Sequence, residues 1–129
     1  MSDAGFEAEW ARASAWLAPA LHHGRDTHSL DDVKAMICDP AESARFWIGR
    51  EAAAVTEIRS YPNAKVFHIW LCGGDLAELT EEMLPIVEHW AIEQGCQMGT
   101  IIGRDGWRKI MPDYGYAPVA TMFLKDLRS

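Results

Sequence analysis

The sequence predicts an α/β fold of the α+β type, with two N-terminal helices and a mixed sheet. Three observations support this class. Apolar residues recur at helical spacing near the N-terminus, strand-like alternation begins at Ala44, and a long helical pattern follows the third strand-like run. The predicted order is therefore helix, helix, an antiparallel meander of three strands, long helix, strand, short helix, strand.

Length and composition indicate one folded domain. The 129 residues are 49% hydrophobic and 24% charged, which is ordinary for a chain with a single core. We expect one domain over residues 1–129, with a helical N-terminal part over 1–40 and a sheet-containing core over 44–127. Six tryptophans would either fill the core or form an interface.

The charge balance excludes one class of partner. Twelve Lys and Arg stand against 19 Asp and Glu, a net charge of −7, whereas nucleic-acid binding requires clustered basic residues. No apolar run reaches the length that spans a bilayer, and the first residues, MSDAGFEAEWAR, do not resemble a secretory signal. We therefore expect a cytoplasmic protein with neither a nucleic-acid ligand nor a membrane partner.

Cysteine and histidine spacing argues against disulfides and metals. Cys38, Cys72 and Cys96 are odd in number and too far apart for a zinc motif, so buried free thiols are expected. His22 and His23, with His28 nearby, lack the spacing of metal ligands. No metal site is predicted.

Two helices are predicted in the first 40 residues. The first is amphipathic, is slowed near Pro19 and ends in the polar segment HHGRDTH. Its apolar stripe comprises Phe6, Trp10, Ala13, Trp16, Leu17 and Leu21. Ser29 and Asp32 match a capping box at the start of the second helix, and Asp39-Pro40 ends it.

Three strands are predicted next, over residues 44–49, 51–61 and 64–74. Their sequences, ARFWIG, EAAAVTEIRSY and AKVFHIWLCGG, are rich in aromatic and β-branched residues. Gly-Arg and Pro-Asn dipeptides separate them. Such short connections produce an antiparallel meander.

A long helix follows, over residues 79–95, with Thr80 as its N-cap and Gly95 as its C-cap. The next segment, CQMGTII, is predicted to be a short buried strand. Because a helix connects this strand to the last strand of the meander, the two should be parallel.

The C-terminal part begins with GRDGWRKIMPDYGY, residues 103–116. Its glycines would turn the chain into a brief helix that starts at Asp105 or Gly106 and ends at Ile110. Gly115 would then allow a tight turn into a closing strand over residues 116–125, whose apolar side chains alternate.

Over residues 44–127 the chain resembles the GNAT (Gcn5-related N-acetyltransferase) family. The resemblance is carried by KVFHIWLCGG, by the long helix ending in EQGC, and by GRDGWRKIMPDYGYAPVATMFLKDL, in which Gly-Tyr precedes the last strand. Short GNAT-like proteins of phages and prophages, which often have a Gly-Arg-x-Gly-Trp segment here, look most similar. The resemblance implies a GNAT-like mixed sheet and, for an enzyme, acetyl-CoA as cofactor.

In this family a loop before the long helix binds the cofactor's pyrophosphate through backbone N–H groups. The corresponding stretch here is LCGGDLAELTEEML, which lacks the family's basic or amide residue. Its acids, Asp75, Glu78, Glu81 and Glu82, would repel a diphosphate. The tentative cofactor-binding residues are Cys72, Gly73, Gly74, Arg104 and Arg108. We expect no cofactor, or acetyl-CoA if the chain is an enzyme.

The family's usual proton donor, a tyrosine four residues before the Gly of the Gly-Tyr pair, corresponds to Met111, which cannot donate a proton. The candidates for a general base are Glu57, His68 and Glu88. For His68 a solvated strand face is an equal explanation. For Arg104, Arg108 and Lys109, charges at a helix C-terminus and surface solubility are the favoured explanation over phosphate binding.

Three hypotheses about function follow. The first is a GNAT-fold protein with a degenerate acetyl-CoA site, a non-catalytic interaction or structural module of phage or prophage type. Its partner would be another protein or a second copy, in the cytoplasm or in a virion. The alternative is an active acetyl-CoA-dependent N-acetyltransferase with a divergent pyrophosphate loop. A third hypothesis is a regulator that binds a small ligand between splayed strands.

Overall fold

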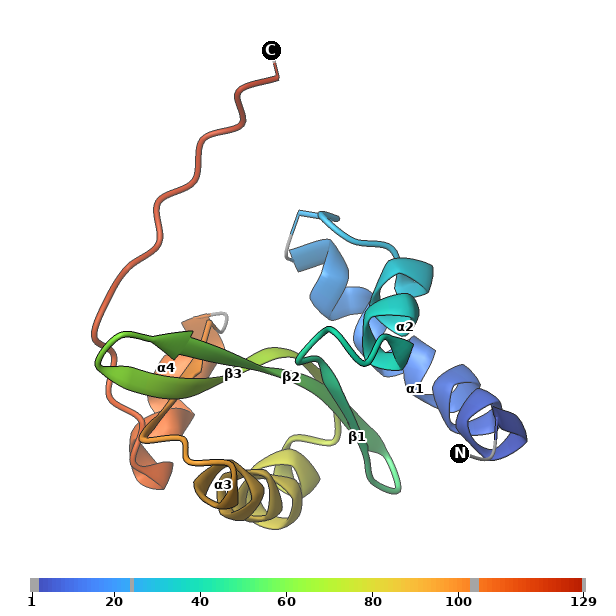
Figure 1. The fold of residues 1–129 in the computed structure, drawn as a ribbon. Helices are drawn as coiled ribbons and strands as arrows, with labels where there is room; N and C mark the ends of the chain where they lie inside the picture. Colours follow the sequence, from blue (N-terminus) through green and yellow to red (C-terminus); the bar gives the residue numbers. More distant parts are fainter. Residues whose placement is uncertain (1–2, 24, 103–104, 129) are drawn as a thin grey trace.

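Helices lie on both faces of a four-stranded sheet in the computed structural model, which describes residues 3–23, 25–102 and 105–128 (Figure 1). The strands are β1 (Arg45–Ile48), β2 (Ala52–Tyr61), β3 (Ala64–Gly74) and β4 (Met98–Ile101), in that spatial order. β1, β2 and β3 are antiparallel, and β3 and β4 are parallel. The predicted α/β class, the meander and the parallel pair are therefore confirmed.

The helical segments also follow the predicted order. They are α1 (Asp3–His23), α2 (Leu30–Cys38), the π-helical turn η1 (Glu78–Met83), α3 (Leu84–Glu93), α4 (Asp105–Ile110) and the 3-10 turn η2 (Met111–Tyr114). Pro19 lies inside α1 and does not end it. No helix in the described part of the chain is both long and apolar enough to cross a bilayer.

One half of the core lies between the sheet and the N-terminal helices. Alternate strand residues Ala53, Val55 and Leu71 face α1 and α2, because successive side chains of a strand point to opposite faces. The helices contribute Trp10, Ala13, Leu17, Leu21 and Val33. The predicted apolar stripe of the first helix is therefore a core-facing stripe.

The other half of the core lies on the opposite face of the sheet. Phe67 and Ile69 of β3 pack there with three residues of α3 and with Met111. The α3 residues are Leu84, Val87 and Ala91. Thr56 points to this side by the ordinary alternation of β2, and its hydroxyl accepts a hydrogen bond from Trp47 Nε1 at 2.9 Å.

Two of the predicted helix caps are confirmed. The Ser29 hydroxyl accepts from the Asp32 amide at 3.1 Å, and the Asp32 carboxylate accepts from the Ser29 amide at 2.8 Å. Gly95, with a φ of 85°, follows the end of α3, and its N–H donates to the Ile92 carbonyl at 3.0 Å. Glycine is favoured there because the left-handed conformation has no Cβ penalty in glycine.

The N-cap prediction for Thr80 is wrong. The helical segment begins before Thr80, and the Leu79 amide already donates to the Asp75 carbonyl at 3.1 Å. The Thr80 hydroxyl instead donates to the Leu76 carbonyl at 3.0 Å from inside the π-helical turn. Threonine can bond either way, so sequence spacing alone did not distinguish a cap from an interior residue.

The predicted last strand over residues 116–125 is also wrong for this chain on its own. Residues 117–128 have no strand or helix, and they extend away from the sheet as a tail (Figure 1). Their apolar, β-branched composition favours a strand, but a strand requires a neighbour to pair with. β4 was predicted to be buried and is only half covered, and Cys38, predicted to be a buried thiol, is exposed.

Candidate functional site

The two parallel strands at the edge of the sheet differ in length, because β3 continues beyond the end of β4. β3 and β4 pair from Val66 opposite Met98 to Ile69 opposite Ile101. β3 then continues for five residues, Trp70–Gly74. The last four of them pair with β2, and in the described part of the chain no strand pairs with their other side. This leaves one backbone edge of β3 facing an opening at the carboxyl ends of two parallel strands, a place where α/β sheets often bind ligands.

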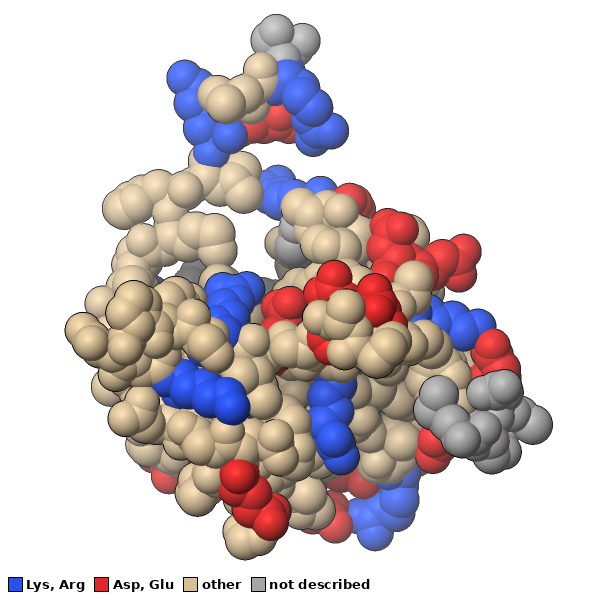
Figure 2. All heavy atoms as spheres, viewed as in Figure 1, with Lys and Arg blue, Asp and Glu red and all other residues tan. Residues whose placement is uncertain are grey.

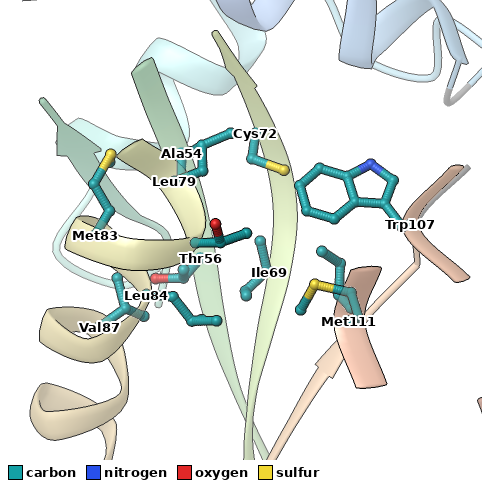
Figure 3. Close-up of a pocket in the computed structure, with 12 residues that line it drawn as sticks. Ala54, Thr56, Ile69, Cys72, Leu79, Met83, Leu84, Val87, Trp107 and Met111 are labelled. Atoms are coloured by element: carbon teal, nitrogen blue, oxygen red, sulfur yellow. The ribbon is translucent and has the colours of Figure 1, made fainter. Parts of the chain in front are cut away.

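A small cavity of about 30 Å³ lies beside this opening (Figure 3). It is lined by Ala54, Thr56, Ile69, Cys72, Leu79, Thr80, Met83, Leu84, Val87, Ile101, Trp107 and Met111. The hydroxyls of Thr56 and Thr80 already have the hydrogen-bond partners described above. The cavity is thus apolar, and it is much smaller than the roughly 150 Å³ cavity that accommodates benzene in an engineered protein.

Two side chains from α4 and η2 close the cavity on the side of the opening. The Trp107 indole points toward Cys72 on β3, and Met111 lies below it near Ile69 (Figure 3). Met111 is buried, and Trp107 is partly buried against the same apolar cluster. The position at which the family resemblance implies a tyrosine therefore faces the cavity with a thioether, which cannot transfer a proton.

The two glycines of the expected pyrophosphate loop are packed against neighbouring backbone. A Cβ on Gly73 would lie 2.0 Å from the Trp16 carbonyl oxygen of α1. Gly74 has a φ of 105°, and its Cβ would lie 2.3 Å from the Glu51 carbonyl oxygen. The next amide, of Asp75, already donates to that Glu51 carbonyl at 2.8 Å. Close packing therefore accounts for both glycines without a phosphate.

Glu78 does not face the opening, contrary to expectation. Its buried carboxylate accepts from the backbone amides of Arg50 and Glu51, at 2.7 and 2.8 Å, in the turn between β1 and β2. These two bonds hold the pKa of Glu78 below its ordinary value. From the other face, Arg12 of α1 donates to the carbonyls of Gly49 and Arg50 at 3.0 and 2.7 Å. Glu78 is therefore a structural group that fixes this turn.

The other acids of this stretch remain at the surface. Asp75, Glu81 and Glu82 are exposed, and Glu82 accepts from the Arg50 guanidinium at 2.8 Å. They lie around the start of the helical segment, where a carboxylate is favourable in itself but discourages an anion.

His68 is buried, with 5% of its surface exposed, so the expectation of a solvated strand face is wrong. Its Nδ1 lies 2.9 Å from the Thr100 hydroxyl of β4, and Glu57 stands opposite it on β2. Burial first, and then the Arg59 charge, lower the pKa of His68, so the ring is neutral at pH 7. Thr100 was missed because strand pairing between distant segments cannot be read from local sequence.

Glu88 lies on α3, away from Glu57 and His68 on the sheet. The Tyr116 hydroxyl donates to its carboxylate at 2.6 Å, which ties the end of η2 to α3. Burial and then Glu88 raise the pKa of Tyr116, so the phenol stays protonated.

The structure thus brings Glu57 and His68 together, with His68 pointing to the face opposite Phe67 and Ile69. Neither this pair nor Glu88 lines the cavity.

Of the four candidate cofactor-binding residues that the structure describes, Cys72 alone lines the cavity. Arg108 is exposed in the last turn of α4. Arg104 lies outside the described residues. Among the described residues no three His, Cys, Asp or Glu side chains are grouped to hold a metal ion.

A comparison with protein-family models finds no match, and no curated protein is significantly similar to the chain. Among solved structures, a mutant of TTHA1254 from Thermus thermophilus is similar, with a TM-score of 0.60 and 13% sequence identity. The similarity covers 93% of this chain and 90% of that one. At this identity the likeness shows a shared fold and nothing about activity.

Proposed function

We propose that this chain is a GNAT-fold protein whose acetyl-CoA site is degenerate and which acts as a non-catalytic interaction or structural module. The phage or prophage setting, in the host cytoplasm or in a virion, comes from the sequence resemblance of the GRDGW segment. The partner is another protein or a second copy. The observation that carries the proposal is the Trp107 side chain beside the part of β3 that extends beyond β4.

Three features support the loss of cofactor binding. Trp107 and Met111 close the opening where a pantetheine arm would pair with the free edge of β3. The N–H of Asp75 is already bonded, and Gly73 is packed against α1. A proton donor is absent from the Met111 position. Each feature removes a different requirement of acetyl transfer: room, phosphate anchoring and proton transfer.

The alternative, an active acetyl-CoA-dependent N-acetyltransferase, is favoured by one observation. The edge of β3 over Trp70–Gly74 has no strand beside it on one side among the described residues. A cofactor could pair with this edge only if the Trp107 indole swung away from Cys72. The enzyme therefore requires the Trp107 side chain to move, whereas the non-catalytic module requires it to stay in place.

Calorimetric titration with acetyl-CoA at low salt tests the proposal. We expect no binding up to about 1 mM for the native chain, because a ligand must first displace the Trp107 indole. Trp107 lies beside Cys72, and a ligand that displaces its indole would change the surroundings of this tryptophan. Tryptophan fluorescence therefore gives a second readout in the same titration. Micromolar binding by the native chain would refute the degenerate site and support the enzyme. Arg108→Ala, which leaves the cavity unchanged, would then show whether that side chain holds phosphate.

A further inference from the structure

The C-terminal tail exposes more apolar surface than a free segment usually does. Val119 and Phe123 are 90% and 91% exposed, and Met122, Leu124 and Leu127 are exposed as well. Figure 2 shows space between part of this tail and the rest of the molecule. Large apolar side chains gathered on an exposed extended segment mark a surface that is normally covered.

The tail carries large apolar side chains on both sides of an extended chain. In an extended chain Val119, Phe123 and Leu127 would point to one side, together with Thr121 and Lys125. Ala120, Met122 and Leu124 would point to the other side, ahead of Asp126. An edge strand on an open sheet would carry polar residues on one of these sides, whereas a strand inside a layered sheet is apolar on both. The tail therefore fits a strand that is partly covered on both faces.

A receiving edge exists at β4. This strand pairs with β3 on one side, and no described segment pairs with its other side. Met98 and, just beyond the strand, Ile102 are 53% and 61% exposed at this edge, while Trp107 lies on the other face. An unpaired strand edge with apolar residues beside it is a template for a further strand.

The geometry at the start of the tail directs it away from its own β4. Gly115, with a φ of 89°, turns the chain, and the bond from Tyr116 to Glu88 fixes the next residue on α3. Pro118 then restricts Ala117 to an extended conformation. The direction is thus set before the apolar residues begin, and the tail leaves the sheet (Figure 1). Its 12 residues, 117–128, reach about 40 Å, enough to meet another molecule.

We propose that residues 117–127 pair as a strand with the β4 edge of a second copy of this chain. A two-fold arrangement would place each tail on the other copy's β4, so that both exposed tails and both open edges are covered at once. This inference goes beyond the function proposed above, because it holds whether or not acetyl-CoA binds.

Sedimentation equilibrium of the full chain tests the pairing. We expect a dimer, and we expect Phe123→Ser in the tail or Ile102→Ser at the edge to raise its dissociation constant by at least about 30-fold. Ile86→Ser is the matched control, since Ile86 is equally exposed, at 61%, but lies on α3. It should leave the dimer unchanged. Deletion of residues 117–129 should give a monomer with an intact circular dichroism spectrum, because neither core cluster includes described residues of the tail.

Hydrogen exchange identifies which copy accepts the tail. In the dimer the amides of residues 119–125 should be protected, and dilution to monomer should remove this protection. A monomer with protected tail amides would mean that the tail pairs with its own sheet, and this contradicts the inference. A chain that stays monomeric with unprotected tail amides would also contradict the inference. A dimer that survives deletion of the tail would contradict it as well.

Discussion

Replacement of Trp107 by alanine tests whether the indole fills the space beside the part of β3 that extends beyond β4. A buried tryptophan side chain covers roughly 150–250 Å². Because Trp107 is partly exposed, we take about 120 Å² as lost, which corresponds to about 3 kcal/mol at 25 cal/mol per Å². For a chain of 129 residues this loss should lower the melting temperature by about 10 °C. Urea denaturation measures the loss of free energy.

Rescue by added indole separates a filled space from simple loss of packing. The Trp107→Ala variant should leave an indole-sized void that joins the existing cavity, so indole at five times its dissociation constant should restore about 1 kcal/mol. Trp70→Ala is the control, since Trp70 is also partly buried but packs against the core cluster of α1 on the other face. A loss below about 0.5 kcal/mol, or equal rescue of both variants, would refute the assignment of Trp107.

Three other substitutions test the local contacts. Glu78→Gln should flatten the pH dependence of unfolding, because the pKa of Glu78 is lowered in the folded chain. The stabilisation by Glu78 is complete above the ordinary pKa of 4.5 and is lost as the pH falls below it. Urea midpoints measured from about pH 6 to about pH 3 test this. Gly73→Ala should lower the free energy of unfolding by more than about 3 kcal/mol, because the new Cβ meets the Trp16 carbonyl. Gly95→Ala should lower it by only about 1–2 kcal/mol, since no atom lies within 4 Å of a Cβ there. Equal losses would contradict the clash at Gly73. Tyr116→Phe should cost about 1 kcal/mol through the lost bond to Glu88, against no change for the exposed Tyr61→Phe, measured by the same denaturation.

Most of the fold could be predicted from the sequence because its signals are local. Alternation and short turns defined the three meander strands to within one residue or so, and Ser29 with Asp32 marked a helix start. The last strand failed for the opposite reason. Residues 116–125 have the composition of a strand, but whether they form one depends on a neighbour that composition does not specify.

The candidate site was less predictable, because it depends on contacts between distant segments. Met111 was correctly identified as lacking a donor, but its place on the cavity wall required the packing of η2 against β3. Glu78 looked like a charge near a helix start, yet it is turned inward by two amides in a turn 27 and 28 residues away. The place of Trp107 depends on the length difference between β3 and β4, which local sequence does not reveal.

The turn between β1 and β2 joins all three layers of the molecule. Its carbonyls are bonded by Arg12 from one helical layer, and its amides by Glu78 from the other. Neither helical layer can detach from the sheet without breaking hydrogen bonds at this turn. Detachment of one layer alone is therefore unfavourable, and the two layers should detach together. A surface turn, ordinarily among the first parts of a protein to open, is here expected to open only with global unfolding.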